Sequence, residues 1–155
     1  MKKKSEHYAR RRNMVKKVLS KDNLEKAKAL QIVKMALEKQ AHQPVVLDVR
    51  GMSSVCDYFV ICSGETGRQV QAIGDNIVKL SREAGFSVHH QEIDESCNWL
   101  LIDFFDVVVH IFTDEARKYY NLEYLWREAK AVSGKPKPKN KKPAKKIPLK
   151  RSRRK

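Results

Sequence analysis

The sequence predicts a single α/β domain with a mixed β-sheet and helices packed against it. Its 155 residues are enough to form one domain with a well-packed core, but they are too few to make two such domains the expected arrangement. A strand, helix, strand succession over residues 57–90 predicts a βαβ unit, whose two strands run parallel. Two adjacent apolar runs over residues 99–112 predict an antiparallel hairpin. A sheet containing both kinds of pairing is mixed.

The first elements are a helix and a short strand. Asp22 and Glu25 form a capping box, and the helix that they open extends to about Lys39. The apolar positions expected on its buried face are Ala29, Ile32, Val33, Ala36 and Leu37. After Pro44, the β-branched run "VVLDV" predicts a strand.

The βαβ unit starts with "DYFVIC", which is apolar almost throughout and is therefore expected to be covered on both faces. Thr66 and Gln69 predict a second capping box, and Gly85 a helix C-cap. "FSVHH", residues 86–90, is the second expected strand. After the hairpin, Thr113 caps a last helical region, and the residues expected to pack it down are Tyr120, Leu122, Leu125 and Trp126.

Charge divides the chain into three parts. Residues 1–21 hold nine Lys or Arg and one acid, residues 135–155 hold twelve and none, and residues 22–134 have a net charge of −5. We therefore expect a disordered basic arm at 1–21, the α/β domain at 22–132 and a disordered Lys/Arg/Pro-rich tail at 133–155. Dense basic arms favour contact with nucleic-acid phosphates over membranes, because neither carries an apolar face. The tail residues expected to contact RNA are Lys141, Lys142, Lys145, Lys146, Lys150, Arg151, Arg153 and Arg154.

The sequence predicts a cytoplasmic protein with free thiols. Its three cysteines lack CxxC spacing, and it shows no signal-peptide pattern and no apolar run long enough to span a membrane. No metal or cofactor is expected, because His89, His90 and His110 lack a second ligand at helical spacing. The loop Ser63–Arg68 precedes a helix, as phosphate-binding loops do, but it lacks the Walker lysine and the full glycine fingerprint. A tight strand-to-helix turn is the favoured interpretation.

The hairpin raises the main functional question. If its loop has two residues, Asp103 and Asp106 face each other, and such like charges need a basic partner or a metal. Both faces of the hairpin are apolar, and Trp99 lies beside aliphatic residues with acidic neighbours. One hypothesis is that the hairpin is a docking surface for a basic partner. The other is that the protein's own helices cover the hairpin and that its aspartates are solvated. A metal-dependent nucleotidyl transferase, using both aspartates and the Ser63–Arg68 loop, is the enzymatic alternative.

Three ordered motifs then resemble a known family. "LDVRGMSSVCDYFVICSGETGRQVQAIGDNI", "NWLLIDFFDVVVHIF" and "EARKYYNLEYLW" are similar to the ribosomal silencing factor family (RsfS, or Iojap-like) from about Leu24 to Trp126. The resemblance implies a nucleotidyltransferase-like fold without catalysis. It also implies binding to ribosomal protein fourteen of the large subunit, which blocks subunit association and represses translation, and a homodimer when the protein is free.

By matching position, the resemblance assigns the partner-binding residues. Trp99, Leu101, Asp103 and Asp106 match the family's docking surface, whereas His110, Glu115, Arg117 and Tyr120 match recurring positions that serve either docking or the fold. Phe105, between the two aspartates, completes the predicted partner-binding set. Phe105 departs from the family, which usually has Gly there to relieve a turn needing positive φ. It implies either a wider loop or an exposed aromatic that touches the partner. On this reading the protein is not an enzyme, and its basic arms add contacts to ribosomal RNA.

Overall fold

A computed structural model describes residues 21–133, which form one six-stranded sheet in the order β3-β4-β5-β2-β1-β6. The strands are β1 (His42–Asp48), β2 (Tyr58–Gly64), β3 (His90–Ile93), β4 (Trp99–Asp103), β5 (Val107–Thr113) and β6 (Lys130–Ser133). The helices are an N-terminal helix described over residues 21–37, α2 (Gly67–Glu83), α3 (Asp114–Tyr120) and α4 (Leu122–Leu125).

The sheet is mixed, as predicted. β2 and β5 pair in parallel, whereas the other neighbouring strands pair antiparallel. β3 therefore runs in the same direction as β2, so β2, α2 and β3 form the predicted βαβ unit with β4 and β5 inserted between its strands. The strand predicted at residues 86–90 was misplaced, because β3 starts at His90. Phe86 and Val88 pack against the core from an irregular segment instead.

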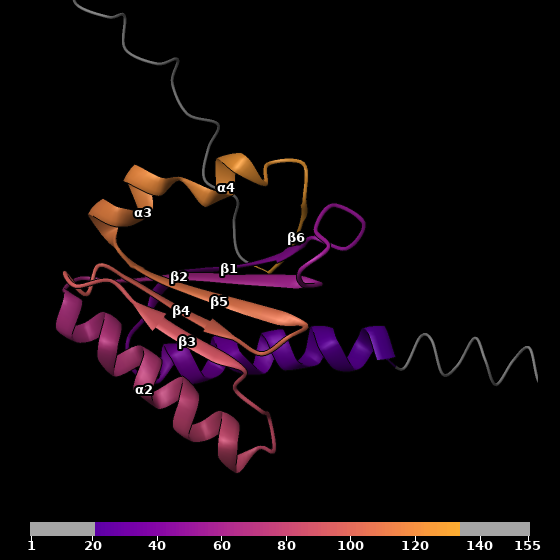
Figure 1. Cartoon of the computed structure of the whole chain (residues 1–155), viewed down its shortest axis with the longest axis horizontal. Helices are drawn as coiled ribbons and strands as arrows, with labels where there is room; N and C mark the ends of the chain where they lie inside the picture. The colour runs from indigo at the N-terminus through magenta and orange to yellow at the C-terminus, as the bar shows by residue number, and fades with distance from the viewer. Residues whose placement is uncertain (1–20, 134–155) are drawn as a thin grey trace, which may run out of the picture.

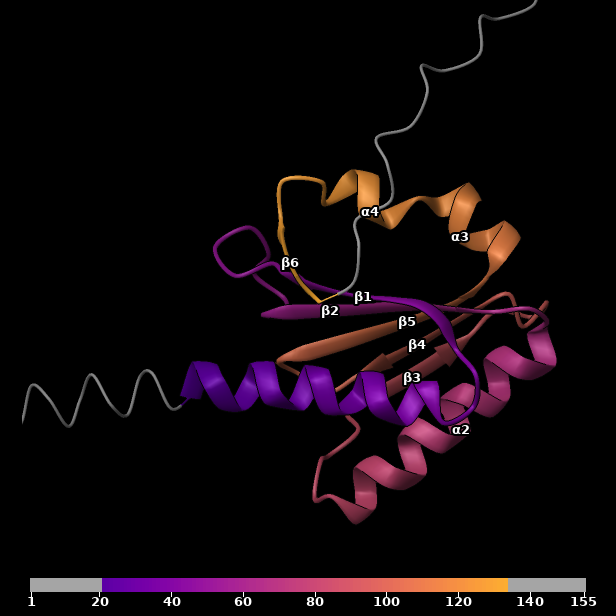
Figure 2. The ribbon, with the colours of Figure 1, turned by 180° about the vertical axis from the view of Figure 1, so that it is seen from behind.

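Helices cover the two faces of the sheet unequally. The N-terminal helix and α2 lie against one face, and the short α3 and α4 lie over the other (Figures 1 and 2). The first face buries one apolar cluster, which includes Ile32, Ile73 and Leu100. The second buries a smaller cluster around Phe59 and Phe112. The helices therefore cover the second face of the sheet less completely than the first.

The sequence signals give the observed ends of α2, but Asp22 does not begin the N-terminal helix, because Lys21 and Asp22 already lie within it. Thr66 accepts a hydrogen bond from the Gln69 backbone N–H (3.2 Å), and Gly85 has φ +82° just beyond α2. The apolar face of the N-terminal helix is buried as predicted except at Leu37, which is 47% exposed. Leu125 was also expected to pack down but is 66% exposed.

The predicted basic arms lie outside the described residues, apart from their innermost positions. No helix between residues 21 and 133 is long and apolar enough to cross a membrane.

Candidate docking surface

The hairpin β4–β5 presents two different faces. Its register pairs Trp99 with Phe112 and Asp103 with Val108. Leu100 and Ile102 point into the cluster beneath the N-terminal helix and α2 and are fully buried. Trp99 and Leu101 point to the opposite face and remain half-buried against the second cluster. Side chains thus alternate between the two faces along β4, which leaves Trp99 and Leu101 accessible.

The hairpin loop separates the two aspartates instead of opposing them. It has three residues, Phe104 to Asp106, so Asp103 lies opposite Val108. Asp103 accepts a hydrogen bond from the Phe105 N–H (2.7 Å), whereas Asp106 forms an ion pair with Lys28 of the N-terminal helix (2.7 Å). The expected repulsion across the hairpin was wrong because it assumed a two-residue loop. Asp106 already has its cation, and Asp103 stays partly open to solvent.

A carboxyl group from the N-terminal helix also lies near this loop. Glu25 is 9% exposed, and its burial together with the neighbouring Asp57 raises the pKa of its carboxyl to about 7. The backbone N–H of Asp57 in turn donates to the Asp106 carbonyl (2.8 Å). The loop is therefore fastened to two other segments of the chain.

Phe105 has the left-handed backbone conformation that glycine adopts most easily. Its φ is +71°, its side chain is 59% exposed, and its ring stacks on His89 at 4.0 Å between centroids. The loop is one residue longer than the two-residue turn, and the aromatic side chain is exposed at its tip, next to Asp103. The structure therefore has both expected features, a wider loop and an exposed aromatic.

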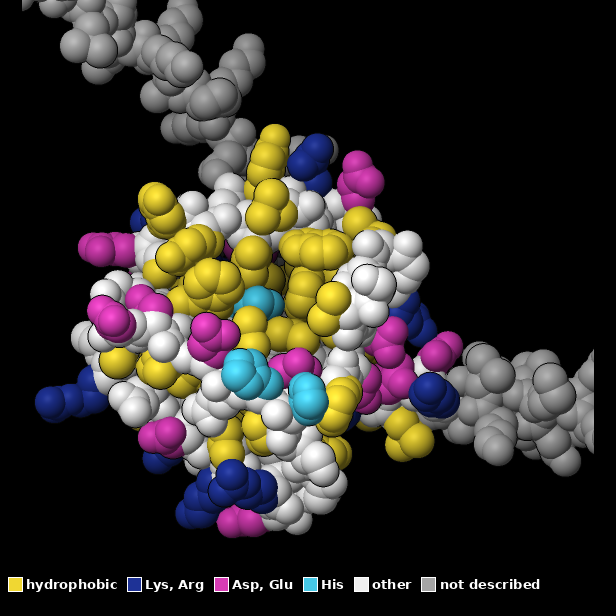
Figure 3. All heavy atoms as spheres, viewed as in Figure 1, with side chains coloured by type: hydrophobic (Ala, Val, Ile, Leu, Met, Phe, Trp, Pro, Cys, Tyr) yellow, Lys and Arg dark blue, Asp and Glu magenta, His cyan; other side chains and the backbone are white. Residues whose placement is uncertain are grey.

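Aromatic and aliphatic side chains meet where β4 and β5 approach α3 and α4. We call this the aromatic surface. Its floor is formed by Phe59, His110 and Phe112, and its accessible members are Trp99, Leu101, Tyr120, Leu122 and Trp126. Figure 3 shows hydrophobic side chains gathered in the upper half of this face, with acidic side chains along their lower and left margins.

His110 connects the floor of this surface to Trp99. The indole N–H of Trp99 donates to Nδ1 of His110 (3.2 Å), so the ring proton of the neutral histidine is on Nε2. Burial lowers the pKa of His110 to about 4, which keeps the ring neutral near pH 7. Within residues 21–133 its buried Nε2 has no hydrogen-bond partner. His110 thus orients Trp99 from beneath rather than presenting its own polar atoms to a partner.

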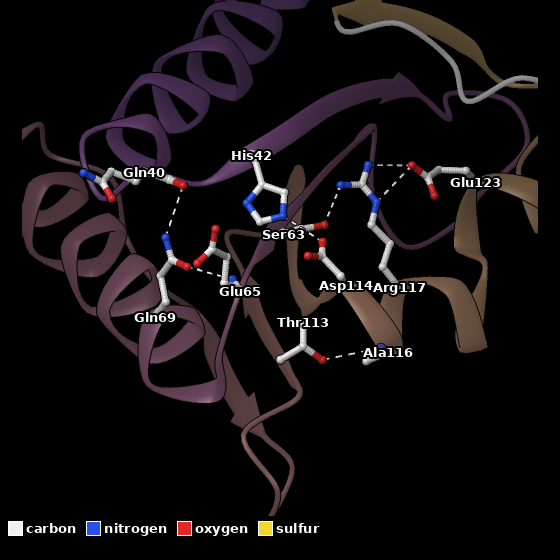
Figure 4. Close-up of polar contacts among 10 residues, drawn as sticks. All are labelled: Gln40, His42, Ser63, Glu65, Gln69, Thr113, Asp114, Ala116, Arg117 and Glu123. Carbon is white, nitrogen blue, oxygen red and sulfur yellow. Dashed lines mark hydrogen bonds and ion pairs between the residues drawn. The ribbon is translucent and has the colours of Figure 1, made fainter.

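Arg117 lies under the surface instead of on it. It is 2% exposed, donates to Ser63 Oγ on β2 (2.8 Å) and binds the Glu123 carboxylate through Nε (3.1 Å), as Figure 4 shows. Its guanidinium therefore joins α3 and α4 to the sheet. Glu115, by contrast, is exposed in the first turn of α3.

The predicted set thus divides by position. Trp99, Leu101, His110 and Tyr120 come together in the aromatic surface, and the rings of Tyr120 and Trp99 pack at a tilt with centroids 4.6 Å apart. Asp103 is the last residue of β4, and Phe105 and Asp106 lie on the hairpin loop that follows it. Sequence reasoning missed Leu122 and Trp126 as surface members, because their helical spacing indicated packing alone. It also missed exposed apolar side chains beside them, at Tyr119, Tyr124 and Leu125.

The residues of the enzymatic alternative do not form one site. Because Tyr58 pairs with Val107 and Gly64 with Thr113, the loop after β2 and the Asp103–Asp106 loop lie at opposite ends of the sheet. Seven strand residues separate them, about 20 Å. The Glu65 N–H is also already bound by the Gln69 side chain (2.7 Å; Figure 4). Among the described residues, no group of three His, Cys, Asp or Glu could hold a metal ion.

The cysteines offer no reactive thiol at this surface. All three are free; Cys56 and Cys62 are buried, and burial raises the pKa of their thiols to about 11 and about 12. What remains is a mixed α/β domain with an accessible aromatic surface beside an acidic hairpin. Such features are typical of a surface that contacts another macromolecule.

Comparison with known proteins specifies the class further. Residues 21–155 match the family described as "Ribosomal silencing factor during starvation" (RsfS), and the chain belongs to that family. Ribosomal silencing factor RsfS of Halalkalibacterium halodurans is 44% identical over 95 residues, which are 61% of this chain and 81% of that protein.

Two further relatives agree. Ribosomal silencing factor RsfS of Bacillus subtilis is 45% identical over 92 residues, 59% of this chain and 78% of that protein. A crystal structure of a Chromobacterium violaceum protein superimposes with a TM-score of 0.64 at 27% identity, covering 73% of this chain and 96% of that one. The family assignment made from the motifs and the single-domain mixed α/β fold are therefore confirmed.

Proposed function

We propose that this protein is a translation repressor that binds the large ribosomal subunit through ribosomal protein fourteen and sterically prevents the small subunit from joining. The observation that carries the proposal is the aromatic surface. Three accessible aromatic side chains, Trp99, Tyr120 and Trp126, lie over a buried floor, a composition typical of binding hot spots. Steric exclusion needs no catalytic group, and this role places the protein in the cytoplasm.

The electrostatics support a basic partner. Asp103 and Glu115 are at least partly accessible, and no lysine or arginine within residues 21–133 forms an ion pair with either. Phe105 extends the contact to the loop tip, while Asp106 is held by Lys28 and Arg117 by Glu123. We therefore assign direct contact to Trp99, Leu101, Asp103, Phe105, Glu115 and Tyr120, and positioning to Asp106, His110 and Arg117.

Replacing Trp99 by alanine should abolish most binding to purified large subunits. Truncating a central aromatic anchor costs about 2–4 kcal/mol, which weakens binding roughly 30-fold or more. Co-sedimentation with large subunits measures this, and adding small subunits shows whether joining is blocked. Tyr124→Ala, an exposed aromatic on α4 outside the defined surface, is the matched control and should bind normally. Full binding by the Trp99 variant would contradict the proposal.

The basic arms supply a second, sequence-independent contact in this proposal. Removing residues 135–155 takes away twelve positive charges. The dependence of log affinity on log salt concentration should then become shallower, because fewer counterions are released from ribosomal RNA. Sedimentation at several potassium chloride concentrations gives the slope. An unchanged slope would mean that the tail does not touch RNA.

A further inference from the structure

The edge of the sheet that contains the hairpin carries acidic residues without basic ones, unlike the rest of the chain. Residues 83–116, which include β3, β4 and β5, contain eight Asp or Glu and no Lys or Arg. Asp106 and Asp114 have partners from other segments, Lys28 and His42, each at 2.7 Å. Within residues 21–133, no lysine or arginine forms an ion pair with the other six acids.

The aromatic surface lies against this acidic edge and is itself uncovered. Tyr120 is 43% exposed, and Trp99 and Leu101 are only half-buried. Accessible aromatic side chains of this size usually receive apolar groups from a binding segment. A segment that fits both features would carry one or two apolar side chains flanked by positive charges.

The chain contains such a segment in its own tail. Residues 135–155 hold twelve Lys or Arg and no acid, and their only large aliphatic side chains are Ile147 and Leu149. These two are separated by Pro148 and flanked by basic residues on both sides, in "KKIPLKR" at 145–151. The proline restricts the unbound backbone, so less entropy is lost when the segment binds.

The tail is long enough to reach the surface. The described part of the chain ends on β6, where Ser133 pairs with Val46 of β1. From β6 to β4 the sheet spans four strand spacings, about 20 Å. Residues 134–147 extend up to about 45 Å, more than twice that span. Being tethered, the segment has an effective concentration in the millimolar range, so even a weak contact is populated.

We propose that residues 145–151 dock on the aromatic surface of the same molecule, with Ile147 and Leu149 against Trp99, Leu101 and Tyr120. Lys145, Lys146, Lys150 and Arg151 then face the acidic edge. The tail covers the docking surface in the free protein. Ribosomal RNA competes for the same positive charges, so the ribosome itself draws the tail away. This consequence rests on the proposed function; the contact within the free chain does not.

Zero-length carbodiimide cross-linking of the full chain tests the contact directly. At micromolar protein and low salt, mass spectrometry should find Lys145, Lys146 and Lys150 joined chiefly to Glu92, Asp103 and Glu115. Ile147→Ser/Leu149→Ser retains every charge and should reduce these products at least fivefold. Pro143→Ser/Ala144→Ser, two changes in the same tail, is the matched control and should leave them unchanged.

Three results would overturn the proposal. Products undiminished in the Ile147→Ser/Leu149→Ser variant would mean diffuse charge attraction without an apolar anchor. Cross-links joining isotopically light and heavy chains after mixing would show that the tail binds a second copy. Cross-links to this edge from residues 1–21 instead would assign the surface to the other arm.

The regulatory consequence is measured separately on ribosomes. Ile147→Ser/Leu149→Ser should bind large subunits severalfold more tightly than the unchanged protein, because its surface is free. If neither protein binds large subunits while the cross-links form as expected, the proposed function fails and the intramolecular contact stands. If both bind equally, the contact does not regulate docking.

Discussion

Replacing Arg117 by methionine should destabilise the protein by about 3–5 kcal/mol, because it removes the cation of a buried ion pair and leaves the other partners in place. Ser63 Oγ, fully buried on β2, would lose its donor, and the 15%-exposed Glu123 side chain would lose its counter-charge. In a domain of this size the melting temperature should fall by roughly 10 °C or more. Urea unfolding monitored by circular dichroism gives the free energy.

A compensated variant separates this positioning role from direct contact with a partner. Ser63→Ala/Arg117→Met/Glu123→Leu replaces the whole polar group by apolar side chains of similar volume, and its stability should return to within about 1–2 kcal/mol of the unchanged protein. If its binding to large subunits also returns, Arg117 acts by fastening α3 and α4. If the variant folds well but does not bind, Arg117 takes part in docking, the other role that the family resemblance left open for it.

The example of Arg117 shows where sequence reasoning about the site reached its limit. The hairpin faces followed from the two-residue alternation, and Trp99 and Leu101 were placed correctly. Whether a polar residue on a short helix points outward or into the core depends on how that helix is tilted. In α3, Arg117 points inward and donates to Ser63, 54 positions earlier in the chain. No local pattern contains that information.

The fold itself was predictable where local signals and packing agree. The Thr66 cap and the continuously buried β2 both follow from their own residues. The misplaced strand at 86–90 shows the opposite case: its alternation is strand-like, but Phe86 and Val88 turn toward the core after α2 ends. β6 was missed because its four residues, "KAVS", carry no pattern, and only pairing with β1 makes them a strand.

Acid should destabilise the protein through His110, and the loss should reach about 2–3 kcal/mol by pH 4.5. Burial lowers the pKa of His110 to about 4, below its ordinary value of 6.5. Between these values the unfolded chain binds a proton that the folded chain does not, so stability falls as pH falls from 6.5 toward 4. Protonation of Nδ1 would also remove the acceptor of the Trp99 indole N–H.

His110→Phe is the variant that isolates this titration. At pH 7 it should be about 1 kcal/mol less stable than the unchanged protein, because Trp99 loses its hydrogen-bond acceptor. At pH 4.5 it should be the more stable of the two, so the two curves of unfolding free energy against pH cross. Glu25, whose raised pKa of about 7 makes stability fall as pH rises above 4.5, is present in both proteins and cancels in their difference.

Whether the two curves of unfolding free energy against pH cross also tests the structure of the docking surface. If they cross, His110 is neutral in the folded protein and holds Trp99 through Nδ1, so the orientation of the principal anchor depends on a group that no partner touches. Parallel curves would mean that His110 titrates normally in the fold. It would then have access to water, and its ring would have to be counted among the groups that meet the partner directly.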